Sequence, residues 1–480
     1  MEKIKNIYTS LLVFVILLTS CQDTLEEIPR DFVSPNNFFN NPTEAKAAVY
    51  SLYNTLANGD AYNISLWWLN TFATPNTVPM TNVDAQVMGN FNYDALHPNL
   101  DYYRGAFKAI LRSNLILEKV PNILMDPTER NALLGEAKFM RGLHYFNMVR
   151  LFGDVPLMTS STILLNEARN NPRVNKEDIY NLIIEDLQFA SEWLPITYPS
   201  SEVGRATMDA AKTVLSLVHL TRKEFKEARD ISKEIIDAGN YSLVADYRHL
   251  YDPAFKNNEE HILSAQYLLF RVGSWFDSWM SPPGSNGCGF ADGQLSVNPE
   301  WYEQYPETYR KEISMMTTYV TTQGNLINYD RPYIKKFHAW GPEIYCYGND
   351  LNFPIFRFAE VLLIFAEAEN EVNGPSLAAY ETINRVRKRA RTYPDGSEAV
   401  DELPDLAGLS QAEFREAVYE EREMELCFEG KSWFDLVRTD RLVSVNQAAG
   451  RSNVSETHLV YPIPQFAMDQ NRGLIQNPGY

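Results

Sequence analysis

Apolar residues recur every three or four positions along most of the chain, a spacing typical of α-helices. Asn, Pro and Gly interrupt this pattern and bound the separate segments. The pattern therefore predicts a mainly α-helical fold. The expected helices lie at 43–57, 105–119, 129–151, 176–193, 206–221, 223–238, 355–372, 376–391 and 410–428.

Three of these helices carry recognisable start signals. Asn-Pro-Thr-Glu at 41–44 and Asp-Pro-Thr-Glu at 126–129 combine a capping residue, a Pro that fits the first turn, and an acid that meets the positive helix end. Ser410 and Glu413 have the spacing of a capping box. Residues 129–151 and 355–368 are apolar around the whole circumference, so we expect both helices to be buried.

The two helices within 206–238 resemble a degenerate tetratricopeptide unit, because small residues in both allow close packing. Two further pairs fit the same plan, 105–119 with 129–151 and 355–372 with 376–391. One such pair does not bury its own apolar face. We therefore expect stacked pairs that form a right-handed superhelical scaffold.

Two long stretches, 58–104 and 239–350, break the helical pattern and are rich in Asn, Gly, Pro, Tyr and Trp. Loops of this length within a compact domain are usually functional. They hold six of the eight tryptophans, which is more than an even spread would give. Exposed aromatic faces bind the apolar faces of sugar rings, and amides or carboxylates bind the hydroxyls.

The two stretches therefore contain a set of candidate ligand-contact residues. Trp275 and Trp279 come first, with Asp277 between them and a turn-forming Pro-Pro-Gly shortly after. The remaining candidates are Trp67, Trp68, Asn70 and Trp340. The alternative is that these rings fill small cores inside the loops, since Trp is a common core residue.

The N-terminus has the features of a secretory signal at 1–20: Lys3 and Lys5, then an apolar run at 11–18 that is too short to span a bilayer. It ends in Leu-Thr-Ser-Cys, which resembles a bacterial lipobox and predicts lipidation of Cys21. The alternative is a cleaved secreted protein with an incidental Cys. Acidic residues follow closely, as in some surface-exported lipoproteins.

Net charge, cysteine content and the absence of catalytic motifs exclude further classes of function. The chain has 43 basic and 62 acidic residues, a net charge of −19, which argues against nucleic-acid binding. Besides Cys21, the cysteines Cys288, Cys346 and Cys427 remain, and an odd count forbids a complete disulfide framework; Cys288 and Cys346 could pair or be buried free thiols. No C-x-x-C, H-E-x-x-H, phosphate loop or G-x-S-x-G occurs, so we expect no cofactor, no metal ligands and no catalytic residues. A glycosidase remains a distant alternative, because a carboxylate pair has no sequence signature.

Five segments together resemble the SusD/RagB family of nutrient-binding outer-membrane lipoproteins. They are the lipobox with its acidic follow-on, EAKFMRGLHYFNMVRLFGDVPL at 136–157, FRFAEVLLIFAEAE at 356–369 with INRVR at 383–387, EREMELCFEGKSWFDLVR at 421–438, and YPIP at 461–464 with QNPGY at 476–480. They occur in the family's order from end to end of the chain.

The resemblance implies a lipid-anchored protein on the cell surface that captures oligosaccharide and delivers it to a TonB-dependent transporter of the SusC type. Peptide uptake is the alternative, because some family members serve it. We expect a signal peptide at 1–20, an N-terminal helical part at 21–238 and a C-terminal part at 239–480, packed as one unit.

The charged residues in these motifs lie among apolar neighbours, where an unpaired charge is very costly. We therefore expect them to form structural ion pairs and not a catalytic site. They are Arg141, Arg150, Arg357, Glu360, Glu421, Arg422 and Glu429.

Overall fold

The computed structural model describes residues 38–57, 61–62, 64–162, 164–268, 271–280, 282–283, 285, 293–320, 324–338 and 350–480, without the side chains of 277 and 278. The longer helices are α2 (Pro42–Ala57), α5 (Tyr102–Lys119), α6 (Pro127–Phe152), α8 (Lys176–Trp193), α9 (Met208–Thr221), α10 (Phe225–Ala238), α14 (Phe358–Asn373), α15 (Leu377–Arg391) and α16 (Gln411–Glu425). The shorter ones are α3 (Ser65–Thr71), α4 (Val83–Gly89), α7 (Leu165–Ala168), α11 (Phe276–Met280), α12 (Pro299–Gln304), α13 (Tyr309–Ser314), α17 (Ser432–Arg438), α18 (Leu442–Ala448) and α19 (Gln465–Gln470).

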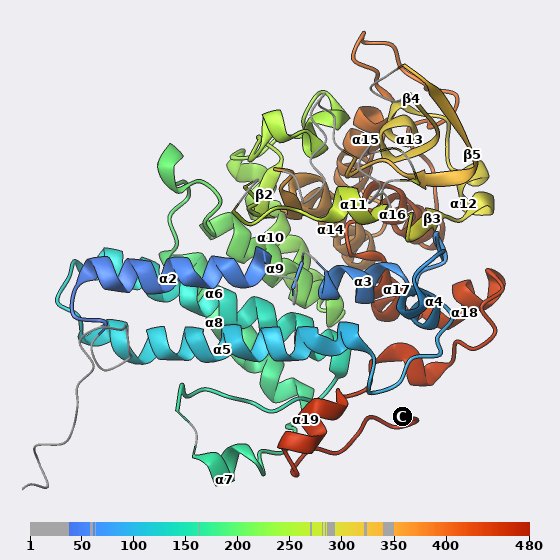
Figure 1. The fold of residues 1–480 in the computed structure, drawn as a ribbon. Coiled ribbons are helices and arrows are strands. Elements are labelled where there is room, and N and C mark those ends of the chain that lie inside the picture. The colour runs from blue at the N-terminus through green and yellow to red at the C-terminus, as the bar shows by residue number, and fades with distance from the viewer. Residues whose placement is uncertain are drawn as a thin grey trace, which may run out of the picture.

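The longer helices form one continuous stack (Figure 1). Helix α5 packs on α6, α6 on α8, α8 on α9 and α9 on α10. Helix α10 then packs on α14, which also contacts α15 and α16, so the N- and C-terminal halves share one hydrophobic core. The predicted mainly helical class and all nine predicted helices are confirmed. The division of the chain after residue 238 stays a prediction.

The predicted start signals act as capping groups. Asp126 Oδ1 accepts hydrogen bonds from the backbone N–H groups of Thr128 and Glu129 at 2.9 and 3.0 Å. At α16, the backbone N–H of Ser410 donates to the Glu413 carboxylate at 2.8 Å, as a capping box requires. The predicted burial of α6 and α14 is confirmed as well, since residues 358–370 of α14 are all buried.

Short strands cross the two stretches that show no helical pattern. A four-stranded antiparallel sheet has the order β1 (Thr77–Pro79), β3 (Leu295–Val297), β5 (Leu326–Ile334), β4 (Met315–Val320). A second antiparallel pair joins β2 (His261–Ala265) to β6 (Phe353–Arg357). Both stretches thus contain regular structure that the sequence pattern did not predict. The register Thr77↔Val297 brings the two stretches together.

Charged residues of the C-terminal half pair with one another inside the core. Glu425 accepts hydrogen bonds from Arg310, Arg357 and Arg389 at 2.5–2.7 Å. Glu429 lies 2.9 Å from Nε of Arg357. The network also includes Glu260, Lys336, Arg387 and Glu421. Predicted ion pairing is confirmed for Arg141, Arg357, Glu360, Glu421, Arg422 and Glu429.

The predicted ion pair is wrong for Arg150, because no carboxylate of the described chain lies within ion-pair distance of it. Its guanidinium lies 3.8 Å from the ring centroid of Phe146 and 3.6 Å from that of Phe434. It also donates to Asn147 Oδ1 at 2.5 Å. Burial lowers the pKa of Arg150 to about 10. Cation–π contacts thus take the place of the expected ion pair.

Several sequence predictions fall where the structure gives no description: the signal peptide, the lipidation of Cys21 and the pairing of Cys288 with Cys346. Cys427 is a buried free thiol, and burial raises its pKa. No helix among the described residues is both long and apolar enough to cross a membrane.

Candidate ligand-binding site

Aromatic rings from the two non-helical stretches meet between α3 and α11. The Trp67 ring contacts Phe276 edge-on at 5.5 Å between centroids. The Trp68 ring contacts Trp279 edge-on at 6.0 Å and 84°. Trp279 in turn lies nearly parallel to Trp275, at 6.3 Å and 20°. The sequence candidates from these two distant stretches are therefore brought together in one aromatic cluster.

Polar contacts hold α3 in place. The indole N–H of Trp67 donates to the carbonyl oxygen of Phe428 at 2.6 Å. Arg451 donates to two carbonyl oxygens just beyond the end of α3, those of Phe72 at 3.0 Å and Thr77 at 2.5 Å. Burial lowers the pKa of Arg451 to about 10, still far above neutral pH. The α3 side of the cluster is thus fixed to the C-terminal part of the chain.

The α11 side is held by the backbone next to the four-stranded sheet. The N–H of Gln294, just before β3, donates to the Trp279 carbonyl at 3.1 Å. The N–H of Met80, just after β1, donates to the Gln294 carbonyl at 2.9 Å. The sheet and α11 therefore form one support beneath the tryptophans.

Burial divides the candidates into two groups. Trp67 is 1% exposed, Trp68 6% and Asn70 1%. The Asn70 amide donates to the Leu66 carbonyl at 2.8 Å inside α3. Rings and amides enclosed in this way present no face to a ligand. We therefore correct the predicted ligand role of Trp67, Trp68 and Asn70: the structure uses them in the core.

Trp275 and Trp279 are half-buried and form the outer part of the cluster. Their exposed surfaces and near-parallel rings suit stacking on a flat apolar ligand face. Asp277 lies between them on α11, but its side chain is outside the described part of the chain. Trp340 lies outside the described residues altogether. The predicted roles of Trp275, Trp279, Asp277 and Trp340 stay predictions.

The sequence interpretation missed the tyrosines of β5. The Tyr329 hydroxyl lies 3.5 Å from the carbonyl oxygen of Pro283, shortly after α11. Its ring meets Tyr333 edge-on at 5.3 Å, and burial raises the pKa of Tyr329 to about 12. Arg331 and Pro332 interrupt the apolar/polar alternation of this segment, so its sequence pattern carried no clear strand signal.

The described residues hold no group of three or more His, Cys, Asp or Glu side chains placed to bind a metal ion. The carboxylates of the buried network are engaged by arginine side chains within the core. What the α3–α11 cluster offers is a rigid aromatic surface suited to binding.

Known proteins resemble this chain along most of its length. Residues 266–480 match the family model described as "SusD family", and residues 33–220 match one described as "Starch-binding associating with outer membrane". SusD-like protein P25 of Formosa agariphila is 28% identical, and the alignment covers 100% of both chains.

Solved structures share the fold. A SusD homolog from Bacteroides thetaiotaomicron has a TM-score of 0.82 at 23% identity, over 93% of this chain and 98% of that one. Surface glycan-binding protein A from the same species, solved in complex with laminarihexaose, has a TM-score of 0.75 at 19% identity, over 91% and 99%. With two family models matching all but the N-terminal segment and one short interval, the chain belongs to the SusD/RagB family.

Proposed function

We propose that this protein is a non-catalytic, cell-surface glycan-binding lipoprotein. It captures oligosaccharide with Trp275 and Trp279 and delivers it to a TonB-dependent transporter of the SusC type in the outer membrane. The observation that carries this proposal is the pair of half-buried, near-parallel tryptophans above a buried aromatic base.

Two further findings support it. A structural relative was solved with laminarihexaose bound, and one matching family model describes starch binding at the outer membrane. The buried Trp68 ring contacts the Trp279 ring edge-on, so this contact helps to fix the orientation of the outer ring. A preformed aromatic surface binds sugar rings with little rearrangement.

Trp275→Ala and Trp279→Ala are expected to weaken oligosaccharide binding about tenfold or more. Each change removes a stacking contact together with the apolar area that it buries. Isothermal titration calorimetry against an oligosaccharide panel that includes laminarihexaose measures the loss. The melting temperature should stay nearly unchanged for Trp275→Ala, because this ring is half-buried at the outer end of the cluster.

Trp193→Ala is the matched control, since Trp193 is also half-buried but ends α8. It should leave binding unchanged. Normal binding by both test variants would place the ligand elsewhere. A sharp fall in melting temperature for both would show that these rings are loop core. Binding of peptides by the wild type, with no saccharide bound, would favour peptide uptake.

Cys21→Ala is expected to abolish fatty-acid labelling and to release the protein from the membrane fraction, because the Cys thiol carries the proposed anchor. Membrane fractionation after labelling tests this.

Affinity purification of the wild type from the same membranes should recover a barrel of transporter size, joined through an interface above about 1,000 Å².

Labelling that persists in Cys21→Ala would disprove the lipidation site. Repeated recovery of the wild type without a barrel would contradict delivery to a transporter, while leaving glycan capture open to the calorimetric test. Cys427→Ala is a control for thiol loss: Cys427 is buried, so labelling should be unaffected.

A further inference from the structure

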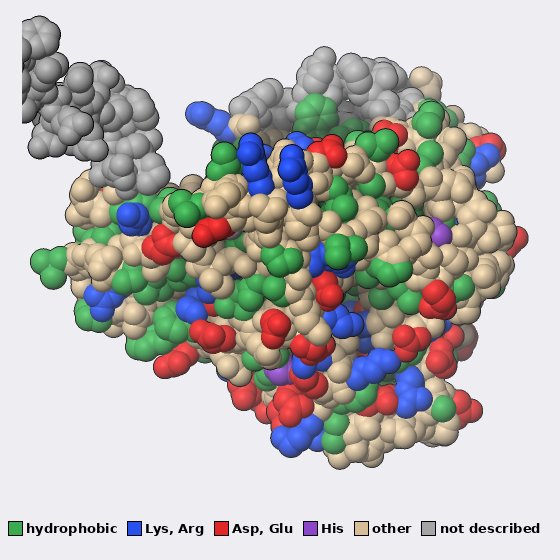
Figure 2. Space-filling model, turned by 90° about the horizontal axis from the view of Figure 1, so that it is seen from below, with side chains coloured by type: hydrophobic (Ala, Val, Ile, Leu, Met, Phe, Trp, Pro, Cys, Tyr) green, Lys and Arg blue, Asp and Glu red, His purple; other side chains and the backbone are tan. Residues whose placement is uncertain are grey.

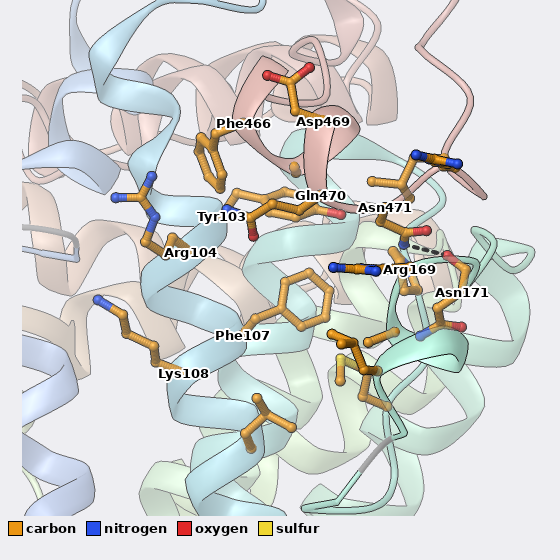
Figure 3. Close-up of a pocket in the computed structure, with 18 residues that line it drawn as sticks. Tyr103, Arg104, Phe107, Lys108, Arg169, Asn171, Phe466, Asp469, Gln470 and Asn471 are labelled. Atoms are coloured by element: carbon orange, nitrogen blue, oxygen red, sulfur yellow. Dashed lines mark hydrogen bonds between the residues drawn. The ribbon is translucent and has the colours of Figure 1, made fainter.

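A large pocket lies on a different part of the molecule from the tryptophan cluster, between α5, α19 and the segment around α7 (Figure 3). Its volume is about 750 Å³, within the range of small-molecule sites. The Asn471 side-chain amide donates to the Asn171 carbonyl at 2.6 Å, which ties α19 to the α7 segment. The pocket is therefore closed on one side by a defined contact.

Aromatic side chains form much of the pocket wall. Phe107 of α5 and Phe466 of α19 are both half-buried, and Figure 3 shows them on facing elements. Tyr103 is 4% exposed, and its hydroxyl has no hydrogen-bond partner among the described residues. Burial raises the pKa of Tyr103, so the hydroxyl remains a donor at neutral pH. An unsatisfied buried donor at a pocket wall is available to an acceptor that enters the pocket.

Two arginines lie at the junction of this pocket with a second hollow of about 540 Å³. Arg169 and Arg472 line both cavities, and the backbone N–H of Arg472 donates to the Arg169 carbonyl at 2.7 Å. Within the described chain, neither guanidinium has a carboxylate at ion-pair distance. Figure 3 shows the Arg169 guanidinium extending towards the α5 wall.

Basic side chains outnumber acidic ones in the lining of this pocket, whereas acidic residues outnumber basic ones in the whole protein. The larger pocket is lined by Arg104, Lys108, Arg169 and Arg472, and by one carboxylate, that of Asp469. The chain as a whole has a net charge of −19. Acidic and basic side chains interleave on the face seen from the α7 and α19 side (Figure 2). A cationic, aromatic concavity on such a surface selects anionic ligands.

We propose that the pocket and the adjoining hollow form a second binding site, which takes an acidic oligosaccharide. Phe107 contacts the sugar rings, and Phe466 adds apolar wall beside it, with the Arg104 guanidinium over one ring face at 4.2 Å from the centroid. Arg169 and Arg472 bind a carboxylate or sulfate group with charge-assisted hydrogen bonds.

The shape favours a saccharide over an acidic polypeptide. The two cavities have volumes of about 750 and 540 Å³, enough for sugar rings, and Arg169 and Arg472 lie where they meet. Amides of Asn171 and Gln470 line the wall and suit hydroxyl groups. The site rests on the proposed function in one respect, that the protein binds glycans. It uses different residues from the tryptophan cluster.

The test is calorimetry of the full mature protein with trigalacturonate, with the same trisaccharide after carboxyl reduction, and with a sulfated galactan fragment of similar length. We expect at least one acidic probe to bind and the carboxyl-reduced one to bind about tenfold more weakly or not at all. The double variant Arg169→Gln/Arg472→Gln should lose about tenfold or more in affinity for the acidic probe. Preference for the carboxylate or for the sulfate identifies which anion the arginines bind.

Arg112→Gln/Arg130→Gln is the charge-matched control, because neither residue lines either cavity. It should bind like the wild type. Equal affinity in both double variants, equal affinity for acidic and reduced probes, or no acidic binding would overturn the site. A pentaglutamate peptide bound as tightly as the saccharides would overturn it in favour of a polypeptide partner. A Trp275→Ala/Trp279→Ala variant that keeps acidic binding separates this site from the proposed function.

Discussion

Replacing Glu425 by Gln is expected to lower the free energy of unfolding by about 3–5 kcal/mol. The Glu425 carboxylate is fully buried and accepts hydrogen bonds from Arg310, Arg357 and Arg389. Gln has the same shape but no charge, so the three guanidiniums would lose the anion that they share. Urea unfolding at neutral pH measures the difference.

Glu420→Gln is the matched control, because Glu420 lies on the same helix and is exposed. Its effect should stay within about 0.5 kcal/mol, as is usual for surface changes. An equally small effect of Glu425→Gln would show that the buried network adds nothing to stability in water.

The same prediction has a pH dependence. Burial alone raises the pKa of Glu425, but the charges of Arg389, Arg357 and Arg310 hold it well below its usual range. A carboxylate with a depressed native pKa stabilises the fold above its unfolded pKa of about 4.3, and that stability is lost as pH falls further. The gap between wild type and Glu425→Gln should therefore narrow below about pH 4.5.

Trp67→Ala is expected to destabilise the protein by about 3–5 kcal/mol, since it leaves a cavity where a fully enclosed ring was packed. Trp67 contacts Phe72 and Phe276 and donates to Phe428. The change also leaves that carbonyl without its donor. Thermal and urea unfolding should both show the loss.

Trp275→Ala serves as the comparison, because it removes a ring of the same size from the half-buried end of the cluster. It should lower the free energy of unfolding far less than Trp67→Ala does, and it should weaken glycan binding more. Unchanged unfolding in Trp67→Ala, together with lost glycan binding, would restore Trp67 as a ligand contact. The pair of variants thus separates core from binding surface.

Long helices were predictable because each carries its own signal. The cap at Asp126 and the apolar circumference of α6 are local properties of the sequence, and both recur in the structure. Helices α3 and α11 span seven and five residues, too few for a periodic pattern. Strands β1 and β3 pair across more than two hundred residues, and nothing local specifies their register.

The same limit applies to the candidate site. Tryptophan enrichment identified the two stretches that meet, but it could not order their rings by depth. Trp67 is buried because Phe276 and Phe428 cover it, and both lie far away along the chain. The pocket lined by Arg169 and Arg472 was missed for the same reason, since its walls come from three separate segments.

The tryptophan cluster has buried rings on one side and half-buried rings on the other. This arrangement also affects the conformational entropy that is lost when a ligand binds. The Trp279 ring meets Trp68 edge-on, and Trp68 meets Phe72 edge-on at 4.6 Å and 89°. Immobilising a flexible side chain during binding costs about 0.5–1.5 kcal/mol. Here that ordering takes place when the chain folds, before any ligand arrives. Discrimination between ligands then depends on the outermost contacts, where loop sequence can vary without disturbing the rings beneath.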